Sequence, residues 1–386
     1  MIYLDNAATT FPKPLSVKNA VNNSFLYSAN PGRAGHSMSI KAAQTLFDCR
    51  NNICRLFNFD KPENVILTPG CTFAHNTVIK GVLNKGDHVV ISSLEHNSVS
   101  RPLEMLREKG IISYNVAKVY EKDPDKTIDS FRNALRDNTK LVVCTHASNV
   151  FGIKLPVSRI GALCRYYGTL FCVDAAQTAG ACDINIKALG ADFICVPGHK
   201  GLYGPMGTGF LIINSDNIPE SIIDGGTGSG SGDLKQPQML PDKFESGTHN
   251  LHGFAGLTQG IDFVMKKSPL RIAQHEMRLT RRLYNELKSI KDVVLYTDEP
   301  ENDHYVPLLS FNLDEVDPER VAMYLDKRFG IAVRAGLHCS PLAHRAFGTE
   351  SVGTVRVCPS VFSTDYEIKK LIDAVFLLSK NKKISI

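Results

Sequence analysis

Seven short apolar runs, separated by polar and amphipathic segments, dominate the first half of the chain. They occupy residues 64–68, 88–92, 112–116, 141–145, 170–174, 192–196 and 209–213. Helical periodicity lies between several of them, at residues 72–83, 130–136 and 157–167. Because continuous apolar strands that alternate with helices are buried on both faces, the pattern predicts an α/β fold with a mainly parallel seven-stranded sheet.

The pattern changes after about residue 262. A long amphipathic helix at residues 271–290 is followed by an apolar run at 306–313, a helix at 318–328 and a final helix from Thr364. These segments predict a smaller α+β domain. We expect residues 16–262 to form the large domain, and residues 1–15 together with 263–386 to form the small one. The glycine-rich residues 224–232 predict a mobile loop at a site or subunit contact.

Composition narrows the class of protein. The 386 residues are 43% hydrophobic and 22% charged, which is ordinary for a globular chain. The net charge of +5 comes without a dense basic patch, so no nucleic-acid partner is expected. No apolar stretch approaches 18 residues and no signal peptide is recognised, so no membrane association is expected. Ten cysteines without CxxC or zinc spacing predict a cytoplasmic protein and no metal site.

Polar residues follow several of the predicted strands. Asp174 ends one apolar run, and Lys200 lies four residues after the next. Ligands of such folds bind at the carboxyl ends of the strands. A lysine that can form a Schiff base, beside a carboxylate that keeps a pyridine nitrogen protonated, is what pyridoxal 5′-phosphate (PLP) chemistry requires. The spacing therefore predicts a PLP enzyme.

Further groups could complete such a site. Cys71 and Thr72 open a helix whose free N–H groups suit a phosphate, although this segment alone is equally typical of an N-cap. His96 follows a strand and could stack on the pyridine ring and move protons as a catalytic residue, although a lone histidine is usually structural. Gln177, three residues after Asp174, and Asn149 could both reach the phenolic oxygen of the cofactor.

Two residues of the second domain stand out. Cys339, beside Gly336 and His338, differs from the cysteines in apolar segments and could be an exposed loop thiol, or an ordinary loop cysteine. Arg356 could bind a substrate carboxylate through two parallel hydrogen bonds, or lie on the surface. Cys358 is the weaker candidate for a nucleophile.

Together these segments resemble the class V aminotransferase superfamily, and within it the cysteine desulfurase and selenocysteine lyase group. The resemblance covers nearly the whole chain. It rests on matching segments in the family's order: Tyr3 to Thr10, Asn30 to His36, Glu95-His96, Ser148-Asn149, Val173 to Gln177, Gly198 to Lys200, Glu245 to Thr248, Gly336 to Cys339 and Val355-Arg356. It implies PLP-dependent transferase fold type I.

The resemblance also implies roles around the cofactor. Lys200 would be the Schiff-base lysine and proton shuttle, Asp174 would pair with the pyridine nitrogen, and His96 would stack on the ring. Gln177 would contact the phenolic oxygen. The phosphate would be held by Thr72, the backbone of Cys71 and His199, together with Thr248 from a partner subunit, which implies a homodimer.

On the substrate side, the resemblance implies that Arg356 grips the carboxylate, with Asn149, His36 and Ala8 nearby. Cys339 would attack the sulfur of L-cysteine, so that alanine and a persulfide are formed and the sulfur passes to an acceptor protein or thiol. The short segment around Cys339 is more like the SUF-type desulfurases than the type with a long mobile cysteine loop.

The chain departs from the family's pattern in two places, and three alternative functions stay open. The helix opening has Cys71, Thr72, Phe73 and His75 where the family commonly has a Thr-Glu pair, and residues 225–232 with 236–242 indicate a less-studied branch. Selenocysteine lyase is the nearest alternative. A class V aminotransferase, epimerase or other lyase would leave Cys339 incidental. A non-catalytic scaffold is disfavoured because Lys200, Asp174 and Arg356 are all present.

Overall fold

A seven-stranded sheet forms the centre of the protein. The computed structural model describes residues 1–31 and 35–380. The strands are β2 (Val65–Thr68), β3 (His88–Ser92), β4 (Ser113–Ala117), β5 (Thr139–Thr145), β6 (Leu170–Asp174), β7 (Phe193–Pro197) and β8 (Gly209–Ile213), in the order β2-β8-β7-β6-β5-β3-β4. Only β8 runs antiparallel to its neighbours. The predicted α/β fold with a mainly parallel seven-stranded sheet is confirmed.

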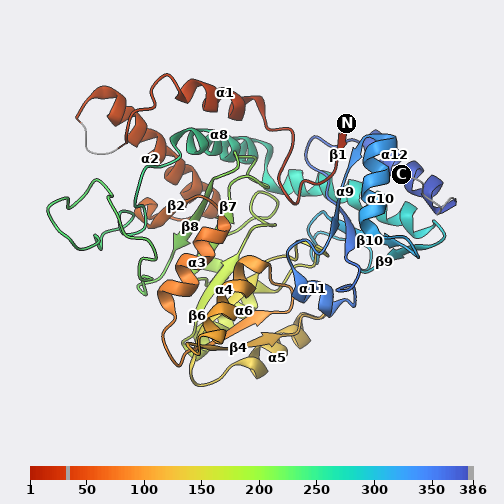
Figure 1. Cartoon of the computed structure of the whole chain (residues 1–386), viewed down its shortest axis with the longest axis horizontal. Coiled ribbons are helices and arrows are strands. Elements are labelled where there is room, and N and C mark those ends of the chain that lie inside the picture. The colour runs from red at the N-terminus through yellow and green to blue at the C-terminus, as the bar shows by residue number, and fades with distance from the viewer. Residues whose placement is uncertain (32–34, 381–386) are drawn as a thin grey trace.

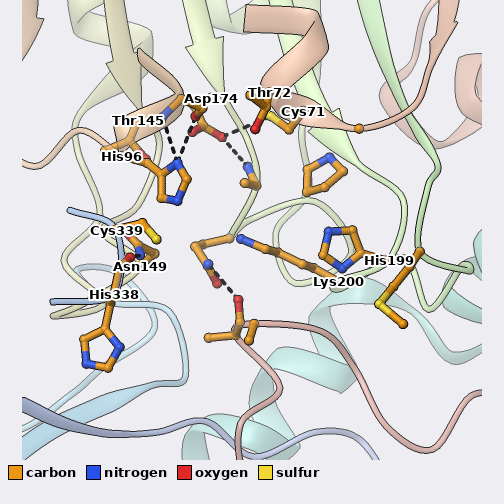
Figure 2. A pocket seen from close by; sticks show the side chains of 18 of the residues that line it. Cys71, Thr72, His96, Thr145, Asn149, Asp174, His199, Lys200, His338 and Cys339 are labelled. Carbon is orange, nitrogen blue, oxygen red and sulfur yellow. Dashed lines mark hydrogen bonds between the residues drawn. The ribbon is translucent and has the colours of Figure 1, made fainter. Parts of the chain in front are cut away.

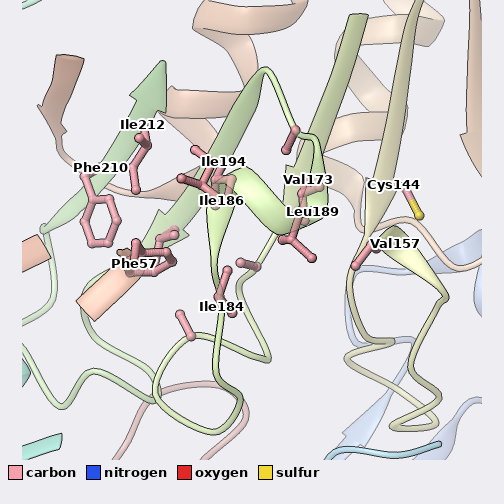
Figure 3. Packing of buried hydrophobic residues seen from close by; sticks show 14 of the residues in the cluster. Phe57, Cys144, Val157, Val173, Ile184, Ile186, Leu189, Ile194, Phe210 and Ile212 are labelled. Carbon is pink, nitrogen blue, oxygen red and sulfur yellow. The ribbon is translucent and has the colours of Figure 1, made fainter. Parts of the chain in front are cut away.

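Helices cover both faces of this sheet (Figure 1). One face packs on α2 (Ser37–Phe57), α5 (Pro124–Ala134), α6 (Val157–Tyr167) and α8 (Leu251–Lys267). The other packs on α3 (Cys71–Val82) and α4 (Asn97–Glu108). Side chains alternate between the faces: Val173 and Ile194 point to the first core (Figure 3), and Cys172 and Cys195 to the second. Burial on both faces explains why the strands are continuous apolar runs.

The helix α8 contains glycines because it approaches another segment closely. A Cβ at Gly260 would lie 2.2 Å from the carbonyl oxygen of Leu202, in the loop that follows Lys200. The helix also packs against α1 (Leu15–Ser24) beside α2 (Figure 1). The short helices η1 (Pro62–Asn64) and α7 (Ile186–Leu189) lie in connections. The missing side chain of Gly260 therefore allows α8 to pack closely against the loop that follows Lys200.

A second set of elements packs around its own core. An antiparallel sheet has the order β12-β13-β10-β9, formed by Arg334–Gly336, Thr354–Val357, Leu309–Leu313 and Val293–Leu295. The strands β1 (Ile2–Tyr3) and β11 (Ile331–Ala332) pair in parallel. The helices here are α9 (Pro269–Lys288), α10 (Pro318–Phe329), α11 (Pro341–Ala346) and α12 (Asp365–Lys380). Leu4 belongs to this core, beside residues from 279–378. The domain boundaries given above stay predictions.

Residues 224–232 contain neither helix nor strand. Within the described residues, no helix is both long and apolar enough to cross a membrane. The segment Asn30 to His36, quoted above for the resemblance, includes residues 32–34, which lie outside the described part of the chain.

Candidate active site

A cavity of about 590 Å³ lies at the carboxyl ends of the central strands, between the main sheet and the second set of elements. Its size is typical of a site for a small molecule or cofactor. All of the predicted site residues except His36 and Thr248 line it: Ala8, Cys71, Thr72, His96, Asn149, Asp174, Gln177, His199, Lys200, Cys339 and Arg356. Lys200 and Cys339 enter it from opposite sides (Figure 2).

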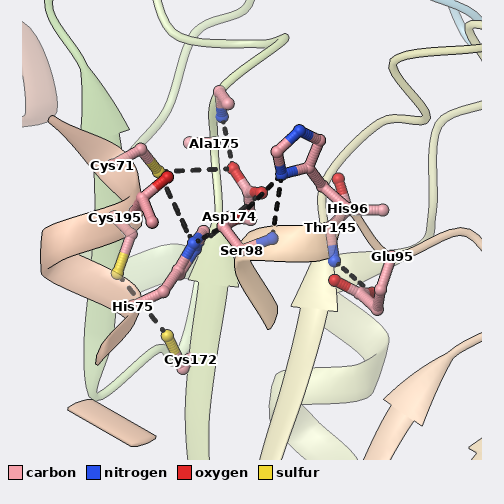
Figure 4. A network of polar contacts seen from close by, with 12 residues as sticks. Cys71, His75, Glu95, His96, Ser98, Thr145, Cys172, Asp174, Ala175 and Cys195 are labelled. Atoms are coloured by element: carbon pink, nitrogen blue, oxygen red, sulfur yellow. Dashed lines mark hydrogen bonds and ion pairs between the residues drawn. The ribbon is translucent and has the colours of Figure 1, made fainter. Parts of the chain in front are cut away.

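Asp174 is held at the end of β6 in a buried polar network (Figure 4). Its Oδ1 accepts a hydrogen bond from the backbone N–H of Ala176 at 2.8 Å and a longer contact from the Cys71 thiol at 3.8 Å. Its Oδ2 lies 3.8 Å from Nε2 of His75, which is completely buried. These contacts fix a carboxylate where it can face a pyridine nitrogen in the cavity.

His75 and His96 are linked through one hydroxyl group. The Ser98 Oγ lies 3.0 Å from Nδ1 of His75 and 2.9 Å from Nδ1 of His96. The backbone N–H of Ser98 already donates to Nδ1 of His96 at 3.1 Å, so that nitrogen is an acceptor. The Ser98 hydroxyl carries a single proton, so it can donate to only one of the two rings at a time.

Burial keeps both imidazoles neutral. It lowers the pKa of His96 to about 4, helped by the nearby Lys200 ammonium, and it lowers the pKa of His75 although Asp174 opposes the shift. A neutral ring at position 96, over the cavity, can stack on a flat aromatic ligand without adding charge.

Lys200 lies in a loop that is held by the N-terminal segment of the chain. The carbonyl oxygen of His199 accepts hydrogen bonds from the side chains of Thr9, Thr10 and Lys13 at 2.7–3.2 Å, and that of Lys200 accepts one from Thr10 at 2.9 Å. Burial lowers the pKa of the Lys200 amine, although Asp174 opposes the shift. A larger neutral fraction makes the amine a better nucleophile toward an aldehyde.

The start of α3 supplies a place for a phosphate. Its N-cap residue, Gly70, has no side chain to cap the helix, and residues 69–72 line the cavity. Across from it, Nδ1 of His199 is buried without a hydrogen-bond partner among the described residues. Uncapped N–H groups, a helix dipole and an unpaired ring nitrogen are the donors that an anion requires. The lysine, the carboxylate and these donors together fit PLP.

Arg356 lies on β13, buried to 2% exposure. Its Nη2 pairs with Asp5 at 2.8 Å and its Nη1 donates to the carbonyl oxygen of Asn149 at 2.8 Å. Its Nε is buried with no partner among the described residues. The alternative that Arg356 lies on the surface is wrong, because the residue is a buried donor on the wall of the cavity.

Cys339 is the one exposed cysteine of the described chain, and it lines the cavity. Cys358 differs: burial and the Glu276 carboxylate raise the pKa of its thiol far above the ordinary value. Its thiol therefore stays protonated, which makes it a poor nucleophile.

His36 and Thr248 lie apart from the cavity within one chain. His36 is exposed and caps α2, where its Nδ1 accepts from the backbone N–H of Ser39 at 3.2 Å. Thr248 is exposed and lines a separate cavity of about 610 Å³, beside residues 226–228 of the glycine loop. Their predicted roles toward substrate and a partner's phosphate stay predictions.

Several residues at the site were not predicted from the sequence, and three of them are polar or charged side chains close to the predicted ones. Ser98 and Arg334 line the cavity, and His75 lies behind Asp174. The signal for His75 was its place one helical turn after Cys71 on α3, which puts both on one face of the helix. Arg334 lies two residues before Gly336 and was not among the predicted site residues.

Comparison with known proteins agrees with this geometry. Residues 2–371 match the family of class V aminotransferases. A protein of Methanothermobacter thermautotrophicus named "Probable cysteine desulfurase" is 37% identical over 380 residues, covering 96% of this chain and 92% of that protein. A "Cysteine desulfurase" of Salmonella newport is 29% identical over 384 residues, covering 96% and 92%.

A solved structure gives the same result for the fold. The apo structure of a cysteine desulfurase from Thermococcus onnurineus NA1 superposes with a TM-score of 0.88 at 29% identity, covering 98% of this chain and 94% of that one. With a family match over residues 2–371, the chain belongs to the class V aminotransferase family.

Proposed function

We propose that the protein is a PLP-dependent cysteine desulfurase, which converts L-cysteine to L-alanine and leaves a persulfide on Cys339. The observation that supports this most strongly is the arrangement of one cavity: an exposed thiol lies on one wall, and a half-buried lysine lies across from it, near a buried aspartate. The relatives named above are cysteine desulfurases, which agrees with the proposal.

The cofactor would be held by residues from several elements. Lys200 would bind its aldehyde carbon, Asp174 its pyridine nitrogen, and the start of α3 with His199 its phosphate. His96 would lie on its ring, and Gln177, which now donates to the carbonyl of Ala7 at 3.2 Å, would lie near its phenolic oxygen. When bound, PLP supplies an electron sink for the carbon that loses a proton.

The chain itself would do three things. Arg356 would orient the substrate carboxylate, for which its unpaired Nε is suited. Lys200 would take the α-proton of L-cysteine and return a proton to the product, since its amine is already biased toward the neutral form. The Cys339 thiolate would attack the substrate sulfur: an S–S bond forms, the Cβ–S bond breaks, and the carbon gains the proton that completes alanine.

Replacing Cys339 by serine tests the sulfur transfer. We expect alanine and persulfide production from L-cysteine to be abolished, while the visible absorbance of the bound cofactor remains. Continued alanine production at the wild-type rate would refute the role of Cys339.

Replacing Lys200 by alanine should remove the absorbance band of the lysine-linked cofactor, and an unchanged spectrum would refute that assignment.

The Cys339→Ser variant also tests the nearest alternative function, selenocysteine lyase. Selenium leaves more easily than sulfur, so a lyase would release alanine from L-selenocysteine without needing the thiol. The exposed position of Cys339 on the cavity wall favours the desulfurase. Alanine release from the two substrates, with and without Cys339, distinguishes the two activities.

We also propose a homodimer, and sulfur transfer to an acceptor protein or thiol. Thr248 lies away from its own chain's cavity and is exposed, so it is available to reach the phosphate in a second subunit. Light scattering coupled to gel filtration should give twice the chain mass. The cytoplasmic location expected from the sequence stays a prediction.

A further inference from the structure

The thiol of Cys339 is presented by a tight turn. The backbone N–H of Ser340 donates to the carbonyl oxygen of Leu337 at 2.9 Å, which closes a four-residue turn. Both central residues have positive φ, 49° at His338 and 58° at Cys339. This region favours glycine, and two successive side-chain-bearing residues adopt it only where the surroundings fix them.

Two segments that adjoin the large sheet bind the turn, the start of α4 and the loop after β5. The carbonyl oxygen of Cys339 accepts a hydrogen bond at 2.7 Å from the backbone N–H of Asn97, the first residue of α4. The carbonyl oxygen of His338 accepts one at 2.8 Å from Nδ2 of Asn149, in the loop after β5. The turn itself lies between β12 and α11, so these bonds join the two halves of the fold.

Asn149 is held in turn by Ser340. The Ser340 hydroxyl donates to Oδ1 of Asn149 at 2.6 Å, and the Ser340 side chain is completely buried. Because the amide oxygen is engaged by Ser340, the amide nitrogen is oriented toward the carbonyl of His338. The carbonyl of Asn149 meanwhile accepts from Arg356 at 2.8 Å. One residue therefore contacts both the thiol-bearing turn and the arginine expected to bind the substrate carboxylate.

We infer that Ser340 and Asn149 form a clamp that fixes the Cys339 turn over the cavity, and that Ser340 is a positioning residue for sulfur transfer. The inference rests on the proposed function of Cys339. Ser340 touches neither cavity nor substrate and acts through Asn149. With the clamp closed, the thiol is held at one distance from the substrate sulfur; without it, the turn relaxes away from its unfavourable φ values and the attack becomes rare.

Amide hydrogen exchange in the cofactor-free protein tests the clamp directly. Replacing Ser340 by alanine should speed exchange at the amides of Ser340 and Asn97 by about tenfold, the effect of losing one buried hydrogen bond. Replacing Ser340 by threonine keeps the hydroxyl and should restore slow exchange. Replacing Ser363 by alanine is the matched control, since its buried hydroxyl accepts from the backbone N–H of Ser360 at 3.0 Å, outside the cavity.

The holoenzyme tests the positioning role. In a single turnover with L-cysteine, S340A should form the Cys339 persulfide about tenfold more slowly, with the substrate Kd and the cofactor absorbance unchanged. Exchange unchanged in S340A would overturn the clamp. Faster exchange with wild-type persulfide formation would overturn the positioning role. If S340A does not fold, Asn149→Asp, followed by exchange alone, keeps the acceptor for Ser340 and loses the donor to His338.

The two hypotheses fail in different ways. If Cys339 is not the sulfur acceptor, the Cys339→Ser variant stays active, while the exchange result for S340A is unaffected. If the clamp is wrong, Cys339→Ser is still inactive, and S340A exchanges like the wild type.

Discussion

At the scale of single residues, His75 provides the clearest test of the network behind Asp174. Its Nε2 lies 3.8 Å from Oδ2 of Asp174, and its Nδ1 lies 3.0 Å from the Ser98 hydroxyl. Replacing His75 by alanine removes one interaction that keeps the carboxylate in place for a pyridinium. We expect the Kd for PLP, measured by fluorescence titration of the cofactor-free protein, to rise about five- to tenfold.

The control for this change lies on the same helix. Lys80 is exposed at the far end of α3, so Lys80→Ala should leave the Kd for PLP unchanged. An unaltered Kd in the His75 variant would mean that the Ala176 N–H and the Cys71 thiol suffice to fix Asp174.

Arg356 offers a second test at this scale. Lysine at this position would keep the charge but lose the planar group that serves Asp5, Asn149 and a carboxylate at once. We expect Arg356→Lys to raise KM for L-cysteine by about tenfold or more, while the cofactor absorbance stays. A wild-type KM from steady-state alanine release would contradict carboxylate binding by this residue.

At the scale of secondary-structure elements, a buried ion pair joins α2 to the segment that contains Thr248. Arg50 pairs with Glu245, and Oε1 of the same carboxylate accepts from the backbone N–H of Leu67 on β2 at 2.7 Å. Removing one partner leaves an uncompensated buried charge. Glu245→Ala should therefore lower the free energy of unfolding by about 3 kcal/mol in urea denaturation.

An exposed pair supplies the comparison. Glu104 and Arg107 pair on the surface of α4, where solvent screens them, so Glu104→Ala should leave the unfolding midpoint nearly unchanged. A similar effect of both substitutions would show that burial of the Arg50–Glu245 pair is not what stabilises this junction.

At the scale of the whole molecule, buried titratable groups set the pH of greatest stability. Burial lowers the pKa of several histidines, to about 4 at His199 and His344 and about 3 at His146. The unfolded chain binds these protons near pH 6.5, so stability falls as pH drops from about 6.5 toward 4. Burial raises the pKa of Glu95 and Glu276 to about 8. The unfolded chain loses these two protons at a lower pH than the folded protein does, so the carboxyl groups reduce stability as pH rises toward 8.

These opposite effects predict a stability maximum near pH 6.5 in the cofactor-free protein. Below that pH the destabilising effect of the histidines is larger than the stabilising effect of the carboxyl groups, because more histidines than carboxyl groups are involved. Urea unfolding at pH 5, 6.5 and 8 measures it. Glu276→Gln, which stays neutral at every pH, should reduce the alkaline decline by about half, and an unchanged decline would contradict the protonation of Glu276.

Much of this architecture could be predicted, because burial on both faces leaves a direct trace in the sequence. The bounds of β3, β6 and α6 agree with the predicted segments to the residue, and Asp174 and Lys200 were found from their places after strands. The helix α8 was not among the predicted helices, because its glycines lower helix propensity. The glycines are required by close contacts with residues 202–208, which the sequence pattern does not show. His75 and Ser98 were not predicted as site residues, because their roles depend on partners that are distant in sequence.

The pairing of β1 with β11 places residue 2 beside residue 331, and the segment that follows β1 supplies the donors to the lysine loop. During synthesis on the ribosome, these first residues have no strand to join until more than three hundred others have emerged. A nascent chain can thus build most of its large sheet while the loop around position 200 is still untethered. The loop that contains Lys200 is therefore fixed in place only near the end of translation.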